Sequence, residues 1–123
     1  MIDHCHDLKI PVWFLNCTVR NKTATIKKVR IKEIILCEYE EDGQFYTEYR
    51  ALIECPYDVE DFQEYEYYYN LTHFYKTKRE ALLESTRLID QEKTIVKEKI
   101  WSLKRYLQSI ENWERLLLID HAD

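Results

Sequence analysis

The sequence predicts an α+β protein: an N-terminal antiparallel sheet of four to five strands followed by a long C-terminal helix or helical hairpin. Two observations predict this class. Residues 10–55 form runs of β-branched, aromatic and alternating apolar residues that suit strands. After the helix-opening sequence Thr77-Lys78-Arg79-Glu80, neither glycine nor proline occurs, so no helix-breaking residue follows.

Residues 10–20 and 26–39 are the first two predicted strands, and residues 21–23 form a plausible turn between them. The alternation of the second strand breaks at residues 34–36, which predicts either a β-bulge or burial on both faces there. Residues 57–61 are expected to be an acidic loop. Residues 62–75 complete the sheet with one or two more strands.

A β-hairpin is predicted around Asp42-Gly43, a dipeptide that accepts positive φ. The inward face of its second strand, residues 44–55, consists of Phe45, Thr47, Tyr49, Ala51, Ile53 and Cys55. On the outer face, Glu48 and Glu54 are expected opposite a basic row. That row is Lys28, Arg30 and Lys32. Such cross-strand charge pairs contribute roughly 0.2–1 kcal/mol each.

The C-terminal segment carries an apolar residue at every seventh position. These residues are Leu82, Ile89, Val96, Leu103, Ile110 and Leu117. One helix over residues 78–119 would be roughly 63 Å long at 1.5 Å per residue. A break near Ser102 or residues 109–112 would instead give two helices. In either case the uncovered stripe predicts a homo-oligomer.

We therefore expect a single domain over residues 1–123. Residues 1–76 form the sheet, and residues 77–120 form a helical oligomerisation segment.

The composition argues against most enzymes. A single glycine, Gly43, rules out a dinucleotide fingerprint or a phosphate-cradling loop. The only serines lie within the predicted helix, and Cys17, Cys37 and Cys55 share strand parity with apolar neighbours, as buried thiols do. No nucleophile, base and orienting group can be assembled, so we predict no catalytic activity.

Metal ions, cofactors, nucleic acids and membranes are not expected as partners. The stretch at residues 3–7, Asp-His-Cys-His-Asp, offers metal-ligand types, but adjacent residues of an extended chain point to opposite sides. The isoelectric point near 5.4 argues against nucleic acid. No apolar window of about 18 residues and no signal-peptide pattern occur, so we expect a cytoplasmic protein, in the host cytoplasm if it is viral.

The junction between sheet and helix is the predicted ligand site. Aromatic rings there would stack on a nucleobase, and cations beside the helix N-terminus would hold phosphate. The residues are Tyr69, His73, Phe74, Tyr75, Lys78 and Arg79, with Arg105, Trp113 and Arg115 from a neighbouring chain. The alternative is that the tyrosines pack a half-exposed sheet and the cations are merely solvated.

Residues 73–85, HFYKTKREALLES, resemble a strand-into-helix junction of small accessory proteins of bacterial viruses and prophages. A short sheet followed by long helices is similar to some anti-defence proteins of that group, including the Thoeris anti-defence type. The resemblance implies a sponge that sequesters a nucleotide-derived immune signal.

Our leading hypothesis is accordingly a non-enzymatic, oligomeric phage or prophage anti-defence protein that sequesters such a signal. The alternative is an inhibitor or adaptor that binds a host protein through its acidic or helical face. A purely structural oligomer also remains open.

Overall fold

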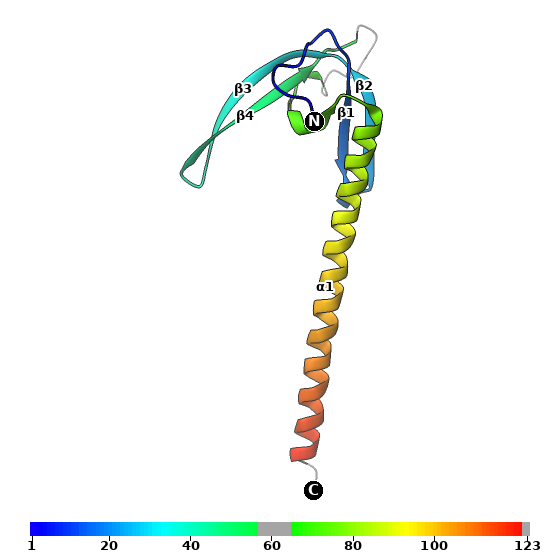
Figure 1. Cartoon of the computed structure of the whole chain (residues 1–123). Helices are drawn as coiled ribbons and strands as arrows, with labels where there is room; N and C mark the ends of the chain where they lie inside the picture. Colours follow the sequence, from blue (N-terminus) through cyan, green and yellow to red (C-terminus); the bar gives the residue numbers. More distant parts are fainter. Residues whose placement is uncertain (57–64, 122–123) are drawn as a thin grey trace. The chain divides into compact units, whose positions relative to one another are not determined.

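The computed structural model describes residues 1–56 and 65–121. The chain divides into two compact units, Met1–Thr86 and Arg87–Asp123. The first holds all the strands and the start of the helix α1 (Figure 1), which confirms the α+β class. The predicted acidic loop at residues 57–61, and the start of the predicted strand after it, lie outside the described residues.

The strands form two three-stranded antiparallel sheets. They are β1 (Val12–Thr18), β2 (Thr23–Val29), β3 (Ile31–Glu41), β4 (Gln44–Ile53), β5 (Tyr68–Asn70) and β6 (Phe74–Tyr75). The first sheet has the order β2-β1-β6 and the second β3-β4-β5. The prediction of one sheet with four to five strands is therefore wrong.

The predicted strand at residues 26–39 is divided between the two sheets. Arg30 separates β2 from β3, and Val12 pairs with Val29 in one sheet while Ile31 pairs with Ile53 in the other. Val29 and Ile31 pack in the same core cluster, so the chain changes sheet while continuing around one core. The irregularity in the β3–β4 ladder falls between Ile31 and Glu33, which corrects the bulge predicted at residues 34–36.

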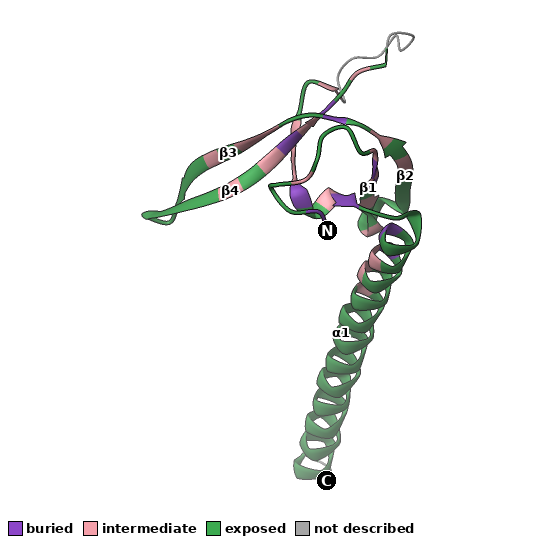
Figure 2. Cartoon of the chain, turned by 45° about the horizontal axis from the view of Figure 1, so that its top comes forward, coloured by how far each residue is buried: buried purple, intermediate pink, exposed green. Residues whose placement is uncertain are grey.

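The β3–β4 hairpin is present, with Asp42 at φ 51° and Gly43 at φ 77° in its turn. Its predicted inward face is buried only near the base, at Ala51 and Ile53. Toward the turn, Phe45 is 82 % exposed, because both faces of that half are open to solvent (Figure 2).

The core of the first unit lies between the two sheets. It consists of Ile2, Val12, Phe14, Ile31, Ala51, Ile53, Leu71 and Phe74. Phe14 is fully buried, and its ring contacts those of Tyr69, His73 and Phe74. Ile2 is held at the edge by a hydrogen bond from its N–H to the Phe74 carbonyl, 3.0 Å long.

The helix α1 runs without a break over Lys78–Asp120, so it is one helix rather than a hairpin. Thr77 caps it as predicted, since its Oγ1 accepts a hydrogen bond of 3.1 Å from the Glu80 N–H. Ala81, in the first turn, is buried in a cluster with Leu15 and Tyr75 of the first sheet.

The cysteines are free thiols, and none is fully buried. Cys17, Cys37 and Cys55 are half-buried, which corrects the prediction that they lie in the core, and Cys5 is exposed. Cys17 and Cys37 lie on strands and Cys55 follows β4, so parity shared with apolar neighbours does not by itself bury a side chain. Over residues 1–56 and 65–121, no helix has a window apolar enough to cross a lipid bilayer.

Candidate functional site

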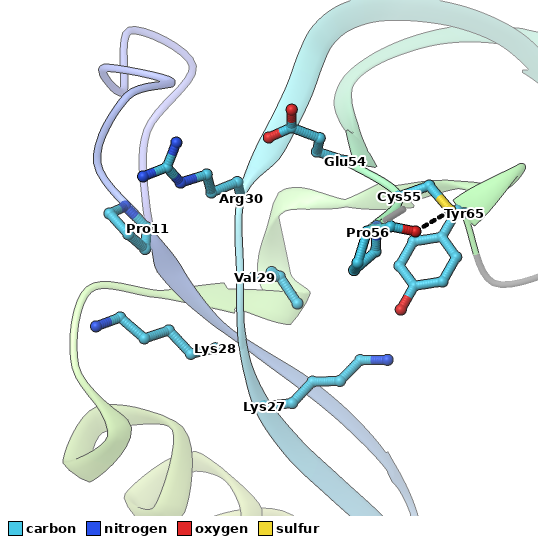
Figure 3. A pocket seen from close by; sticks show the side chains of 9 residues that line it. All are labelled: Pro11, Lys27, Lys28, Val29, Arg30, Glu54, Cys55, Pro56 and Tyr65. Atoms are coloured by element: carbon cyan, nitrogen blue, oxygen red, sulfur yellow. Dashed lines mark hydrogen bonds between the residues drawn. The ribbon is translucent and has the colours of Figure 1, made fainter. Parts of the chain in front are cut away.

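A pocket of about 420 Å³ in the first unit gathers three cations from four consecutive positions. It lies where β2 passes into β3, beside the chain that leaves β4 (Figure 3). Its lining residues are Pro11, Lys27, Lys28, Val29, Arg30, Glu54, Cys55, Pro56 and Tyr65. Pockets of a few hundred cubic ångströms are typical of small-molecule sites.

The two adjacent lysines line the pocket from opposite sides of β2 (Figure 3). Successive side chains of a strand point to opposite faces, and in Figure 3 Lys27 extends toward Tyr65 while Lys28 extends toward the side of Pro11. Lys27 is half-buried, with its Nζ 5.4 Å from the centre of the Tyr65 ring and 5.9 Å from that of Phe14. The Lys27 ammonium is therefore held by aromatic faces at the inner side of the pocket.

Arg30 completes the basic wall. Its carbonyl accepts a hydrogen bond of 2.7 Å from the Glu54 N–H, which fastens the β2–β3 junction to the end of β4. No ion pair that neutralises Lys28 or Arg30 occurs among the residues described. The described lining thus holds three cations and one acid, Glu54, although the protein as a whole is acidic.

The predicted opposition of the basic row to Glu48 is wrong. Lys28 lies on β2 opposite Trp13, in the other sheet from Glu48. Glu48 instead accepts hydrogen bonds of 2.6 Å from Arg50 Nε and from Asn70 Nδ2. The hydrogen bond to Glu48 raises the pKa of the Arg50 guanidinium. Glu48 is therefore paired with Arg50, a cation of the same strand.

Four residues of the predicted site belong to the protein's own packing. Phe74 is fully buried, and the Tyr69 ring meets Phe14 edge-on at 4.8 Å. The Tyr75 hydroxyl donates to the Thr72 carbonyl at 2.7 Å. His73 Nδ1 lies 2.8 Å from the carbonyl oxygen of Leu15, so its imidazole links the 3₁₀ turn before β6 to β1.

The other predicted site residues are exposed. Lys78 and Arg79 lie at the start of α1, with Lys78 Nζ 5.7 Å from the centre of the Trp13 ring. Arg105, Trp113 and Arg115 lie in the second unit. The prediction assigned Arg105, Trp113 and Arg115 to a neighbouring chain, and that part of the site stays a prediction.

Sequence reasoning missed Lys27, Pro11 and Tyr65 as pocket residues. The available signal was the density of cations in Lys27-Lys28-Val29-Arg30. The sequence pattern instead favours pairing of these basic residues with acidic strands, because nothing in the sequence indicates that the chain changes sheet at Arg30.

The polar atoms of the N-terminal stretch are used in local turns. Asp3 Oδ1 accepts from the Cys5 N–H at 2.8 Å, and Asp7 Oδ1 accepts from the Lys9 N–H at 3.0 Å. The described part of the chain contains no group of three or more His, Cys, Asp or Glu residues placed to hold a metal ion.

No protein-family model, curated protein or solved structure matches the chain. The chemistry of the pocket is therefore the guide to function.

Proposed function

We propose that the protein is a non-enzymatic binding protein that sequesters a small, anionic, nucleotide-derived molecule in the pocket at the β2–β3 junction. The observation that carries the proposal is that Lys27, Lys28 and Arg30 line one pocket together with the ring of Tyr65. This moves the proposed binding site from the sheet–helix junction to the β2–β3 junction.

The pocket chemistry fits a phosphate joined to a flat ring. Lysine supplies a point charge, and arginine supplies a planar donor fork that matches phosphate oxygens. Tyr65 and the prolines Pro11 and Pro56 offer apolar faces to a base or sugar. Glu54 favours ligands that also carry hydrogen-bond donors, such as ribose hydroxyls or an exocyclic amine.

Under the sponge hypothesis, the biological role is that of a phage or prophage protein that binds an immune signal and so removes it from the host cytoplasm. It requires tight, stoichiometric binding without turnover of the ligand. Recovery of intact nucleotide after heat denaturation of the protein purified from its host would meet that requirement. Recovery of a hydrolysed nucleotide would exclude the sponge hypothesis, because it would mean that the protein turns the ligand over.

Isothermal titration with ADP-ribose, which joins a purine to a diphosphate, tests the pocket. We expect Arg30→Glu to weaken binding at least tenfold, because a charge-assisted contact to phosphate is replaced by repulsion. Lys32→Glu is the matched control, since it makes the same charge change at an exposed position outside the pocket.

Equal losses in the two variants would mean that general electrostatics, not the pocket, attracts the ligand. Lys78→Glu and Arg79→Glu test the junction site that the sequence predicts. Loss of binding in those variants with Arg30→Glu unchanged would return the site to the start of α1.

A second function is favoured by the open half of the β3–β4 hairpin. Phe45 is 82 % exposed, and Tyr39 and Tyr46 stack on each other with ring centres 5.5 Å apart. Four acids lie beside them: Glu38, Glu40, Glu41 and Asp42. Exposed aromatics ringed by acids fit the basic surface of a host protein, as the inhibitor or adaptor hypothesis requires.

If the hairpin is the interface, the wild-type chain should capture a host protein in a pull-down. The Phe45→Ala variant should fail to capture it. Tyr67→Ala is the control, because Tyr67 is an exposed aromatic residue, 63 % accessible, outside the hairpin. Capture that survives Phe45→Ala, or that fails equally in the control, would reject this interface.

A further inference from the structure

The second unit presents an apolar stripe on α1, interrupted by Lys93 and Glu114 at two of the intervening positions. Its members at seven-residue spacing are exposed by between 38 % and 67 %: Ile89, Val96, Leu103, Ile110 and Leu117. In the C-terminal half, Ile100 and Leu107 fill the intervening positions. Apolar residues at alternating steps of four and three form the seam by which helices supercoil around each other.

The charges along α1 fall into blocks. Residues 80–92 hold four acids and one base, residues 93–105 five bases and one acid, and residues 106–120 three acids and one base. Within the helix as described, no ion pair joins a base of the middle block to an acid of the last block. The middle and last blocks are therefore complementary in sign and unpaired with each other.

This block pattern selects one orientation for a second copy of the helix. A parallel pair in register would place the basic blocks side by side, where like charges repel. An antiparallel pair overlapping at the C-terminal half places each basic block against the partner's acidic block. We propose that the protein forms such an antiparallel dimer through residues 97–120 of α1.

The seam fixes the stagger of the two helices. When Leu107 lies opposite the partner's Ile110, Ile100 lies opposite the partner's Leu117. The flanking position then sets Lys104 beside the partner's Glu111, and the two-fold symmetry makes that contact twice. Leu103 meets the partner's Glu114, whose methylene stem covers it while the carboxylate stays in water.

Two further residues support this stagger. Lys99 comes beside the partner's Asp120, which adds a second symmetric charge pair. Tyr106 comes beside the partner's Trp113, so the exposed rings of this face, 66 % and 63 % accessible, cover each other. The dimer does not depend on the proposed ligand pocket.

Energy transfer between dyes attached enzymatically to the C-terminus tests the orientation. The overlap places the helix ends, Asp120 of each chain, about 35 Å apart at 1.5 Å per residue. A parallel pair would place them about 10 Å apart, the usual distance between packed helices. A full-length dimer with the longer separation supports the proposal; the shorter separation, or a monomer throughout the concentration range, overturns it.

Charge exchange tests the register. Glu111→Lys should raise the dissociation constant of the dimer about tenfold or more, because two attractive contacts become repulsive. The double variant Lys104→Glu, Glu111→Lys should restore dimerisation. Glu98→Lys is the control, since residue 98 lies on the face away from the stripe at about 100° per residue.

Sedimentation equilibrium measures the dissociation constants, and circular dichroism verifies that each variant keeps its helix. Failure of the double variant to recover, or an equal loss in Glu98→Lys, would overturn the register.

Discussion

The Tyr68 hydroxyl donates a hydrogen bond to Glu33 Oε1 across the second sheet. This bond is the main reason why the pKa of Tyr68 is raised above the ordinary value of 10.0, since ionising the phenol would remove the donor beside a carboxylate. A raised folded-state pKa means that the stabilising contribution is fully present below pH 10. It is lost as the pH rises through the folded-state value.

We therefore expect the stability difference between wild type and Tyr68→Phe to be largest near neutral pH and to shrink above about pH 10. Urea unfolding of both proteins at several pH values measures it. Tyr67→Phe serves as the control, because it removes the hydroxyl of an exposed neighbouring tyrosine and leaves the Tyr68–Glu33 hydrogen bond in place. A constant gap for Tyr68→Phe would show that its hydroxyl does not contribute through this bond.

Thr77 stabilises the start of α1 as its N-cap residue. Its side chain satisfies one of the free N–H groups at the start of α1. Thr77→Ala should lower the free energy of unfolding by about 1 kcal/mol, whereas Thr77→Ser, which keeps the hydroxyl, should stay near wild type. Equal urea midpoints for all three proteins would mean that the cap contributes nothing.

Among the elements, the β3–β4 hairpin has a turn whose backbone needs positive φ. An added Cβ at Gly43 would meet nothing within 4 Å, so any cost of Gly43→Ala comes from backbone strain alone. We expect that cost to be about 1–2 kcal/mol. Because the outer half of the hairpin is exposed on both faces, the loss should be local and should not spread to the core.

Hydrogen exchange of the backbone amides near the turn measures this effect. Exchange at Tyr39 and Tyr46 should speed up in Gly43→Ala, while amides at Phe14 in the core should stay unchanged. Gly43→Asn should behave more like wild type, since asparagine tolerates the left-handed region. Unchanged exchange at the turn would contradict the strain argument.

At the scale of the whole molecule, the charges are sorted by segment. The net charge of −5 conceals a basic pocket wall and a basic block in α1, each beside acidic regions. Both proposed interactions have an electrostatic part that salt screens over about 10 Å at 0.1 M. ADP-ribose affinity should therefore fall as salt rises, and Arg30→Glu should flatten that dependence.

Self-association makes a second prediction at this scale. If folded chains dimerise and unfolded chains do not, mass action should raise the unfolding temperature of α1 over a roughly hundredfold increase in protein concentration. Circular dichroism of the helix signal follows it. Glu111→Lys should reduce this concentration dependence, and a temperature independent of concentration in the wild type would argue against the dimer.

Local chemistry was sufficient to predict several features. Thr77 capping α1 and the turn at Asp42-Gly43 each depend on residues a few positions apart, and both are present. The helical segment after residue 77 also follows from local pattern, but that pattern left one helix or two open, and only the structure shows a single helix. The stripe on α1 also follows from spacing alone, because every helix of 3.6 residues per turn places those positions on one side.

Contacts between distant segments decided the rest. The sequence reads as one strand through Arg30, but core packing of Val29 and Ile31 assigns β2 and β3 to different sheets. The same packing buries Phe74, so this ring is not accessible to stack on a ligand as predicted. It also brings Tyr65 beside Lys27, which forms one side of the pocket. Alternation reports only which side of a strand a residue occupies, whereas burial depends on what covers that side, and only the tertiary structure supplies the cover.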